Sequence, residues 1–390
     1  MLNEAVRDDL LEAPIEKEQR VTPLELFFDL VFVFTLTQVT GFLYRDPTWV
    51  RLVEALALLM VLWSAWTGYA WLGNTAGNDE GMMRVVLLAA MAALLVASLA
   101  VPRAFGKYAL IFGVAYLLVR GLTILGYAVL ARSDPRLGTV VTRLATSVLP
   151  AAGVLVVAGL VPEPARGICW VIALAIGYIG LLLTGTEGWR VEPAHFAERH
   201  GLVIIIALGE SIVALGVGAA GLDLTAGVIT AVVLGLAAAG CLWWAYFDVV
   251  STVAERKLRE ATPVVRARIA RDSYSYLHLP MVTGIVVFAF GVKETLVHVH
   301  AHLGSVPAAA LCGGVALYLL ALSTLKRRNI GSFNYPRLVA SAVLVALAFV
   351  ATAVPALLSL ALVAAVTCGM IAYEVWRYAE ARDRIRHGTA

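Results

Sequence analysis

Charged residues are scarce in this sequence. Asp, Glu, Lys and Arg account for 15% of its 390 residues, whereas hydrophobic residues account for 61% and the mean hydropathy is +0.84. A soluble domain needs a more polar surface than this composition supplies. The net charge of +3 gives no indication of a nucleic-acid partner. The sequence therefore predicts a protein whose main partner is the lipid bilayer.

Motifs for cofactor chemistry are also lacking. The four cysteines stand singly in apolar stretches, without the spacing of a metal site or a redox pair, at Cys169, Cys241, Cys312 and Cys368. The sequence contains no ATP-binding loop, nucleophile elbow, zinc-protease helix or dinucleotide fingerprint. We therefore expect no cofactor, no metal and no pump driven by nucleotide hydrolysis, and we do not expect an enzyme.

Apolar stretches long enough to span a membrane dominate the chain. A transmembrane helix needs about 20 mostly apolar residues. Such stretches occur about twelve times, near 24–43, 50–73, 82–101, 107–131, 138–160, 166–185, 200–219, 225–250, 275–296, 305–323, 337–354 and 356–376. The predicted fold class is an all-α membrane protein with about twelve transmembrane helices, and eleven or thirteen remain open.

Positive charge is distributed unevenly between alternate loops. If the N-terminus lies inside the cell, most of the 30 Lys and Arg residues fall in cytoplasmic segments, with dense groups in 256–271, 326–337 and 377–386. Cytoplasmic loops of membrane proteins carry such an excess. Both termini are therefore predicted to be cytoplasmic.

Two stretches of the sequence are similar to each other. Residues 30–38 (LVFVFTLTQ) align with residues 202–210 (LVIIIALGE), which places Gln38 opposite Glu210. Six spans in each copy would give two halves of the same orientation, as in transporters built from parallel repeats. The predicted organisation is a cytoplasmic N-terminal segment (1–22), a first six-helix half (23–190), a second six-helix half (191–377) and a cytoplasmic C-terminal tail (378–390).

Two carboxylates, Glu25 and Asp29, lie at the start of the first predicted span. The sequence Thr22-Pro23-Leu24-Glu25 is typical of a helix start, in which Thr22 is the cap and Glu25 reaches back to it. Asp29 lies one turn further in, on the same face, where the first carboxylate repels it. Two interpretations of Asp29 remain open, a polar proton or ion site and a structural bond to a neighbouring helix.

Arg120 and Glu210 fall near the middle of the fourth and seventh predicted spans. Charges at that depth are costly, usually face the bundle interior and are commonly paired or functional. We therefore expect an Arg120–Glu210 pair, which either locks two helices together or makes Glu210 a gated proton or cation site. Glu25, Asp29, Arg120 and Glu210 are the candidate transport residues.

A further polar cluster is predicted at the cytoplasmic face. Arg199 and His200 open the seventh span, and Asp248 closes the eighth after an aromatic run. Their similar depth predicts contact of Asp248 with Arg199 or His200, in a cluster with Asp29. Snorkelling side chains with aromatic anchors at the membrane interface are the alternative explanation.

Two motifs carry a family resemblance. Residues 23–34 (PLELFFDLVFVF) and 198–212 (ERHGLVIIIALGESI) together resemble the bacterial low temperature requirement protein A family, and the likeness extends over nearly the whole chain. This resemblance implies a multi-pass protein of the bacterial plasma (inner) membrane, linked to growth in the cold and without an assigned substrate. Phe27-Phe28-Asp29 also resembles, more weakly, the Arg-x-x-x-Phe-Ser-Asp motif of potassium channels built from six-helix repeats, although Leu24 stands at the arginine position.

These observations favour a secondary transporter or ion-coupled permease for a small ion or a proton. Three alternatives remain open: a cation channel, a membrane enzyme acting on lipid, and a stress or scaffold protein in which the buried charges are only structural. The sequence does not define the substrate, the coupling ion or the oligomeric state.

Overall fold

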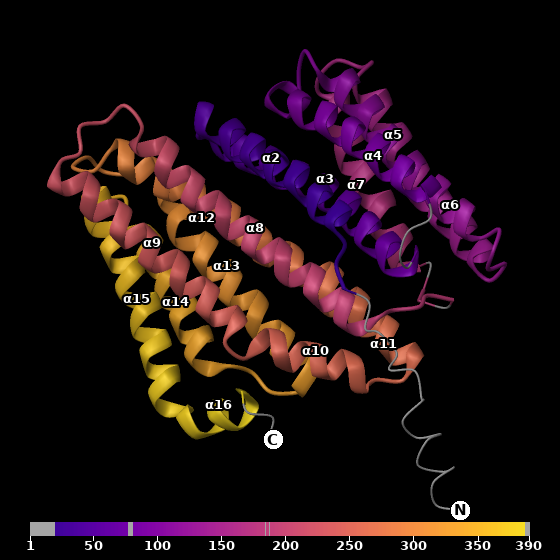
Figure 1. The fold of residues 1–390 in the computed structure, drawn as a ribbon. Coiled ribbons are helices and arrows are strands. Elements are labelled where there is room, and N and C mark those ends of the chain that lie inside the picture. The colour runs from indigo at the N-terminus through magenta and orange to yellow at the C-terminus, as the bar shows by residue number, and fades with distance from the viewer. Residues whose placement is uncertain (1–19, 77–80, 184, 187, 387–390) are drawn as a thin grey trace, which may run out of the picture.

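The computed structural model describes residues 20–76, 81–183, 185–186 and 188–386, most of which lie in helices (Figure 1). The N-terminal group comprises α2 (Pro23–Arg45), α3 (Trp49–Ala76), α4 (Gly81–Ala100), the short η1 (Val101–Arg103), α5 (Ala109–Leu130), α6 (Leu137–Ala158) and α7 (Ala165–Leu183). The C-terminal group comprises α8 (Pro193–Ala219), α9 (Ala226–Phe247), α10 (Val250–Glu260), α11 (Pro263–Ile269), the π-helical η2 (Ala270–Tyr276), α12 (His278–Val297), α13 (Ser305–Ile330), α14 (Tyr335–Val350), α15 (Ala356–Arg377) and α16 (Ala379–Arg386). No named strand occurs among these residues, so the predicted all-α membrane fold is confirmed.

Eleven helical segments of the described chain are long and apolar enough to cross a bilayer, and α14 is the shorter twelfth. At 1.5 Å per residue, the 16 residues of α14 rise about 24 Å. The helix begins where Arg337 Nε and Nη2 each donate to Glu374 at 2.9 Å, near the C-terminal end of α15. Beyond its other end, the Ala356 N–H donates to the Ala301 carbonyl at 2.8 Å, just before α13. Thus α14 runs the length of its neighbours, in agreement with about twelve predicted crossings.

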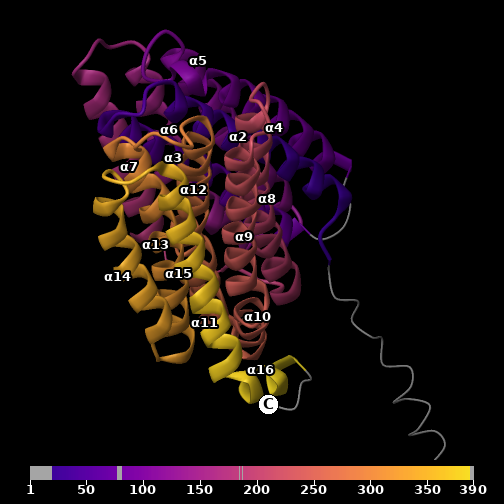
Figure 2. The ribbon, with the colours of Figure 1, turned by 90° about the vertical axis from the view of Figure 1, so that its left-hand side faces the viewer.

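The two helix groups lie side by side and meet along four helices. Figures 1 and 2 show α2 and α3 of the N-terminal group next to α8 and α12 of the C-terminal group. Within each group the packing order is similar, since α4 packs on α5 and α5 on α6, while α12 packs on α13 and α13 on α14. The interface between the groups therefore runs through the middle of the bundle.

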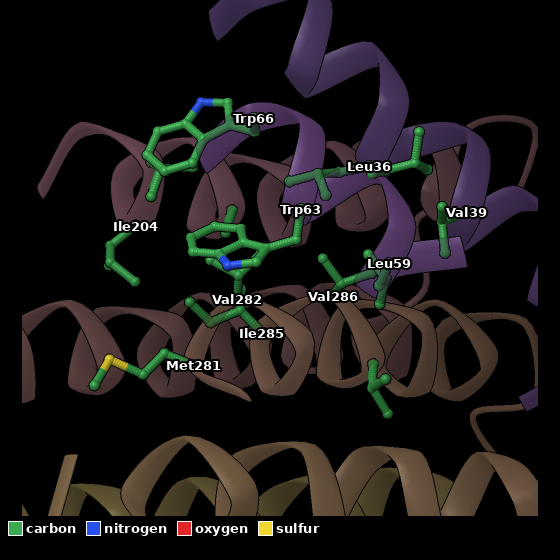
Figure 3. Packing of buried hydrophobic residues seen from close by; sticks show 14 of the residues in the cluster. Leu36, Val39, Leu59, Trp63, Trp66, Ile204, Met281, Val282, Ile285 and Val286 are labelled. Atoms are coloured by element: carbon green, nitrogen blue, oxygen red, sulfur yellow. The ribbon is translucent and has the colours of Figure 1, made fainter. Parts of the chain in front are cut away.

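Large aromatic side chains fill this interface. Trp63 and Trp66 of α3 stack with ring centroids 4.9 Å apart, and Figure 3 shows Trp63 lying over Val282 and Ile285 of α12. The Trp63 Nε1–H donates to the Ser275 carbonyl at 2.7 Å, so the indole is buried without an unpaired donor. The centre of the bundle is consequently packed by rings rather than open to water.

Glycines bring α12 and α13 into backbone contact. A Cβ added at Gly284 would lie 2.5 Å from the Gly314 carbonyl oxygen, and one added at Gly314 would lie 2.6 Å from the Gly284 carbonyl oxygen. Neither helix backbone can move aside without disturbing its own hydrogen bonds. Small residues at such crossings are common in membrane bundles, because they allow close van der Waals contact.

We expect Gly314→Val to destabilise the folded protein by about 1–3 kcal/mol, the usual cost of overpacking. The matched control is Gly313→Val, because a Cβ at Gly313 meets no described atom within 4 Å. Thermal unfolding of both purified variants in the same detergent measures the difference. Equal melting temperatures for the two variants would contradict the close backbone contact.

Candidate functional site

The first turn of α2 positions the Glu25 carboxylate. The Thr22 hydroxyl accepts from the Glu25 N–H at 3.3 Å, while Glu25 Oε2 accepts from the Thr22 N–H at 2.9 Å. This reciprocal capping was predicted from the sequence, and it uses one oxygen of the carboxylate. The other oxygen, Oε1, is left to face the neighbouring helix α8.

Arg199 of α8 joins both carboxylates of α2. Its Nη1 donates to Glu25 Oε1 at 2.5 Å and its Nη2 donates to Asp29 Oδ1 at 3.0 Å. The Arg199 side chain is completely buried, and Glu25 and Asp29 are 3% and 1% exposed. Ion pairs without water are strong only when their geometry is close, and removing one partner leaves an uncompensated charge. The sequence placed Arg199 and Asp29 in one predicted cluster, but it named Asp248 as the contact of Arg199.

His195 extends this cluster toward α3. The Asn74 side-chain amide is oriented by the backbone of Glu192, which accepts from Asn74 Nδ2 and donates to Asn74 Oδ1, each at 3.0 Å. Asn74 Nδ2 therefore presents a donor to His195 Nδ1 at 3.2 Å. A neutral His195 accepts there and carries its hydrogen on Nε2, from which it donates to Glu25 Oε2 at 3.0 Å.

The cluster retains unused hydrogen-bonding capacity. Asp29 Oδ1 also accepts from the Trp66 indole at 2.9 Å, but Asp29 Oδ2 and Arg199 Nε have no hydrogen-bond partner in the described part of the chain. Gly73 leaves the space that the ion pair occupies, because a Cβ there would collide with Glu25 Oε1. With both carboxylates ionised and His195 neutral, the cluster has a net charge of −1.

Beside Asp29 lies a layer of buried rings from α8, α9, η2 and α12. The Trp66 and His200 rings meet edge-on at 5.1 Å, and His200 is 5.2 Å from the His278 ring. His200 Nδ1 donates to the Phe196 carbonyl at 2.8 Å, which leaves its Nε2 as an acceptor without a partner among the described residues. His278 Nδ1 donates to the Ser273 carbonyl, so its Nε2 accepts from the Tyr246 hydroxyl at 2.9 Å.

Glu210 lies further along the same pair of helices. Its Oε2 accepts from the Thr37 hydroxyl of α2 at 2.5 Å, and the residue is 1% exposed. No salt bridge to Glu210 forms among the described residues, although Lys293 of α12 acts on it electrostatically. The Lys293 ammonium sits 3.9 Å from the centroid of the Tyr44 ring. Glu210 is thus a buried carboxylate held by a hydroxyl rather than by a cation.

Apolar packing separates the two polar sites. Arg199 and Glu210 are eleven positions apart on α8, which corresponds to about 16 Å of helix. Phe32, Leu36 and Ile204 lie between them and are at most 1% exposed. The α2–α8 seam therefore has a charged cluster near the N-terminal ends of both helices, an apolar middle and a single carboxylate beyond it.

The expected Arg120–Glu210 pair is wrong. Arg120 Nη1 donates to the Ser64 carbonyl of α3 at 2.5 Å, and α5, which carries Arg120, packs on α3, α4 and α6. Glu210 belongs to the α2–α8 seam. Hydropathy gave both residues a similar depth, but it contains no information on which helices are neighbours.

The expected contact of Asp248 with Arg199 or His200 is also wrong. Asp248 forms an ion pair with Arg382 of α16, whereas Arg199 is bound by the α2 carboxylates and His200 by a carbonyl. The C-terminal helix α16 turns back toward the end of α9 (Figure 2), and this return cannot be read from the sequence.

Sequence reasoning missed the partners that complete the two sites: His195, Asn74, Trp66, Thr37 and Lys293. The spacing of His195 four residues before Arg199 places both on one helix face, and this was a usable signal. The other partners come from α2, α3 and α12 and have no spacing relation to the residues they contact.

We expect Arg199→Gln to destabilise the protein by about 3 kcal/mol or more, because it leaves two buried carboxylates without their cation. Arg51→Gln is the matched control: Arg51 also contacts two carboxylates, Asp46 and Glu54, but its side chain is 37% exposed, and such pairs contribute about 1 kcal/mol or less. Thermal unfolding in detergent compares the variants. Adding Asp29→Asn to Arg199→Gln should recover part of the loss, and failure to do so would argue against the charge explanation.

Comparisons with known proteins found a matching family model and a similar bacterial protein. The family model for the bacterial low temperature requirement A protein (LtrA) matches residues 20–372. Uncharacterized protein RA0937 of Rhizobium meliloti (strain 1021) is similar, with 28% identity over 366 residues that cover 91% of this chain and 88% of the relative. The matched range includes Glu210, Arg120 and the Arg199 cluster, which comprises Glu25, Asp29, His195 and Arg199. This chain, a multi-pass membrane protein, belongs to the bacterial low temperature requirement A family.

Proposed function

We propose that this protein is a secondary transporter of the bacterial plasma membrane, coupled to a proton or small cation that binds along the α2–α8 seam. The supporting observation is Glu210, a buried carboxylate whose direct partner is the Thr37 hydroxyl. A carboxylate that serves only to join helices is better stabilised by a cation, as Glu374 is by Arg337. An intramembrane carboxylate held in this way suits reversible binding of a proton or cation.

The Arg199 cluster is the second proposed binding point. Its two carboxylates carry one more charge than its single arginine balances. A proton on Asp29 Oδ2, which lacks a described partner, makes the cluster neutral. A proton moving between Asp29 and Glu210 must pass Phe32, Leu36 and Ile204. Alternating access supplies a reason for this apolar middle, because rearrangement of α2 against α8 would admit water on one side at a time.

The orientation proposed from the loops is supported by where the basic residues lie. The Arg- and Lys-containing helices α10, α11 and α16 are at the end of the bundle that also holds the N-terminal ends of α2 and α8 (Figures 1 and 2). Both termini are then cytoplasmic, and the Arg199 cluster faces the cytoplasm while Glu210 lies toward the outer half. The sequence similarity between residues 30–38 of α2 and 202–210 of α8, the first helices of the two groups, fits a transporter that arose by duplication.

Flux in liposomes tests the proposal. We expect the wild-type protein to dissipate a proton or cation gradient, and we expect Glu210→Gln and Asp29→Asn to reduce the initial rate by about tenfold or more, since each removes a charge that the passing ion needs. Glu374→Gln is the matched control, because Glu374 is also a buried carboxylate but is fully engaged with Arg337. It should lower stability and leave the rate per folded molecule unchanged.

The same measurement separates the alternatives. Rates too large for a conformational cycle would replace the transporter with a channel. Absence of flux from folded wild-type protein, over proton, sodium and potassium gradients, would contradict ion coupling and favour the enzyme or scaffold explanations. Equal loss of flux in Glu374→Gln would indicate that any damage to the bundle stops transport, and Glu210 would lose its assigned role.

Topology is testable with reporter fusions. We expect alkaline phosphatase to be active when fused after Ala353, between α14 and α15, and inactive when fused after α16, because α15 crosses the membrane between these points. A fluorescent protein that folds in the cytoplasm should give the opposite result at each site. The same activity at both positions would contradict the end-to-end path of α14 and α15.

A further inference from the structure

Arg120 lines a cavity that the α2–α8 seam does not include. The cavity has a volume of about 80 Å³ and lies among α3, α5, α6, α7 and η2. A cavity of about 10–15 Å³ holds one water molecule, so this cavity is large enough for several waters or a small ligand. Its walls are aromatic and aliphatic, with Trp63, Trp71, Tyr178 and Trp189 among the lining residues.

The guanidinium of Arg120 is buried and has no counter-charge among the described residues. The residue is 3% exposed; its Nη1 donates to the Ser64 carbonyl at 2.5 Å, and its Nε has no partner among the described residues. Gly68 makes room for it, because a Cβ there would be 2.8 Å from Nη1. No salt bridge to Arg120 forms in the described ranges. A buried cation without an anion is costly, and an anion from outside the chain would compensate it.

The other described charged residue of the cavity wall, Arg271, has a carboxylate partner in Asp272, which it shares with Arg328. Arg271 Nε donates to Asp272 Oδ1 at 2.8 Å. The described lining residues include no Asp or Glu. A second cavity, in the C-terminal group, shows the contrast: its Arg337 is paired with Glu374 and its Arg382 with Asp248. Arg120 therefore differs from these arginines in having no carboxylate partner among the described residues.

We propose that this cavity binds a small organic anion, whose carboxylate or phosphate group is held by Arg120 and whose apolar body packs against the tryptophan rings. The Ser64, Thr67 and Thr123 side chains that line the cavity near Arg120 are neutral, so they cannot replace the anion as an ion-pair partner of Arg120. Guanidinium suits carboxylate and phosphate because its donors are planar and paired. The apolar walls favour a ligand that is more than an inorganic ion.

The cavity connects this site with the end of the bundle that is proposed to be cytoplasmic. Thr186 and Trp189, which follow α7, line it together with Arg271 of η2, while Arg120 lies in the middle of α5. A ligand entering from the cytoplasmic end would meet Arg271 before Arg120. The inference does not depend on the proposed proton path, since binding at Arg120 is measured without flux.

Hexanoate is a suitable probe, with hexanamide as its neutral isostere. In phosphatidylcholine nanodiscs, titration of tryptophan fluorescence should show hexanoate binding to the wild-type protein, and hexanamide and inorganic phosphate should bind at least about tenfold more weakly, the effect expected from losing one charge-assisted contact or the apolar body. Hexanamide binding as tightly as hexanoate, or phosphate binding as tightly, would overturn the proposal.

Variants assign the binding to Arg120. Arg120→Met should weaken hexanoate binding by about tenfold or more, while Arg45→Met, which removes an exposed cation at the end of α2, should have no effect. Gly68→Ala keeps the charge and displaces the guanidinium, so it should also weaken binding and provides a second test if Arg120→Met fails to fold. Unchanged hexanoate affinity in folded Arg120→Met or Gly68→Ala would overturn the assignment.

Anionic lipid is the other source of the same chemistry. Nanodiscs containing phosphatidylglycerol distinguish the two. If hexanoate binds the wild-type protein more weakly there than in phosphatidylcholine nanodiscs, and Arg120→Met shows no such difference, the anionic lipid also occupies the site. Equal hexanoate affinity in both nanodiscs would support a soluble ligand. If the wild-type protein binds hexanoate but shows no ion flux, only the proposed transporter is contradicted. If it shows ion flux but does not bind hexanoate, only the anion site is contradicted.

Discussion

The buried Arg199 guanidinium, shared between Glu25 and Asp29, is the interaction on which the arrangement of the two helix groups depends. It joins the first helix of one group to the first helix of the other, and all three side chains are buried. His195 and Trp66 also hydrogen-bond the two carboxylates, so the positions of α2, α3 and α8 are linked through one charge. Any movement of α2 along α8 must break or redistribute these contacts.

The α2–α8 seam is held by several ionic contacts at one end, but its other carboxylate, Glu210, has no salt bridge among the described residues. Near its start the charges are multiply bonded, whereas Glu210 is bonded to the Thr37 hydroxyl and is neighboured by Lys293. The apolar stretch of Phe32, Leu36 and Ile204 keeps these sites apart, and tight packing of Trp63 on α12 closes the centre of the interface. The seam therefore holds a polar site, a dry barrier and a second polar site in series, and the proposed ion coupling is based on this arrangement.

Arg120 and Arg199 illustrate how surroundings decide the role of a buried charge. Both are nearly inaccessible and both lie within membrane-spanning helices. Arg199 faces two carboxylates and stabilises a helix contact, whereas Arg120 faces a carbonyl and an aromatic cavity. The first arginine is ion-paired with two carboxylates of the chain, whereas the second has no carboxylate partner among the described residues. Depth in the membrane alone does not distinguish these two situations.

The sequence by itself determined the membrane environment, the all-α class, the position of each span and the capped start of α2, because apolar length and local spacing are properties of contiguous residues. It also identified Asp29, Arg120 and Glu210 as unusual, since charge inside an apolar span is visible in one dimension. Only the tertiary structure decided their partners. Arg120 lies against α3 rather than Glu210, and Asp248 lies against α16 rather than Arg199, because the contacts depend on which helix faces are turned toward each other, and long-range packing rather than local sequence sets that rotation.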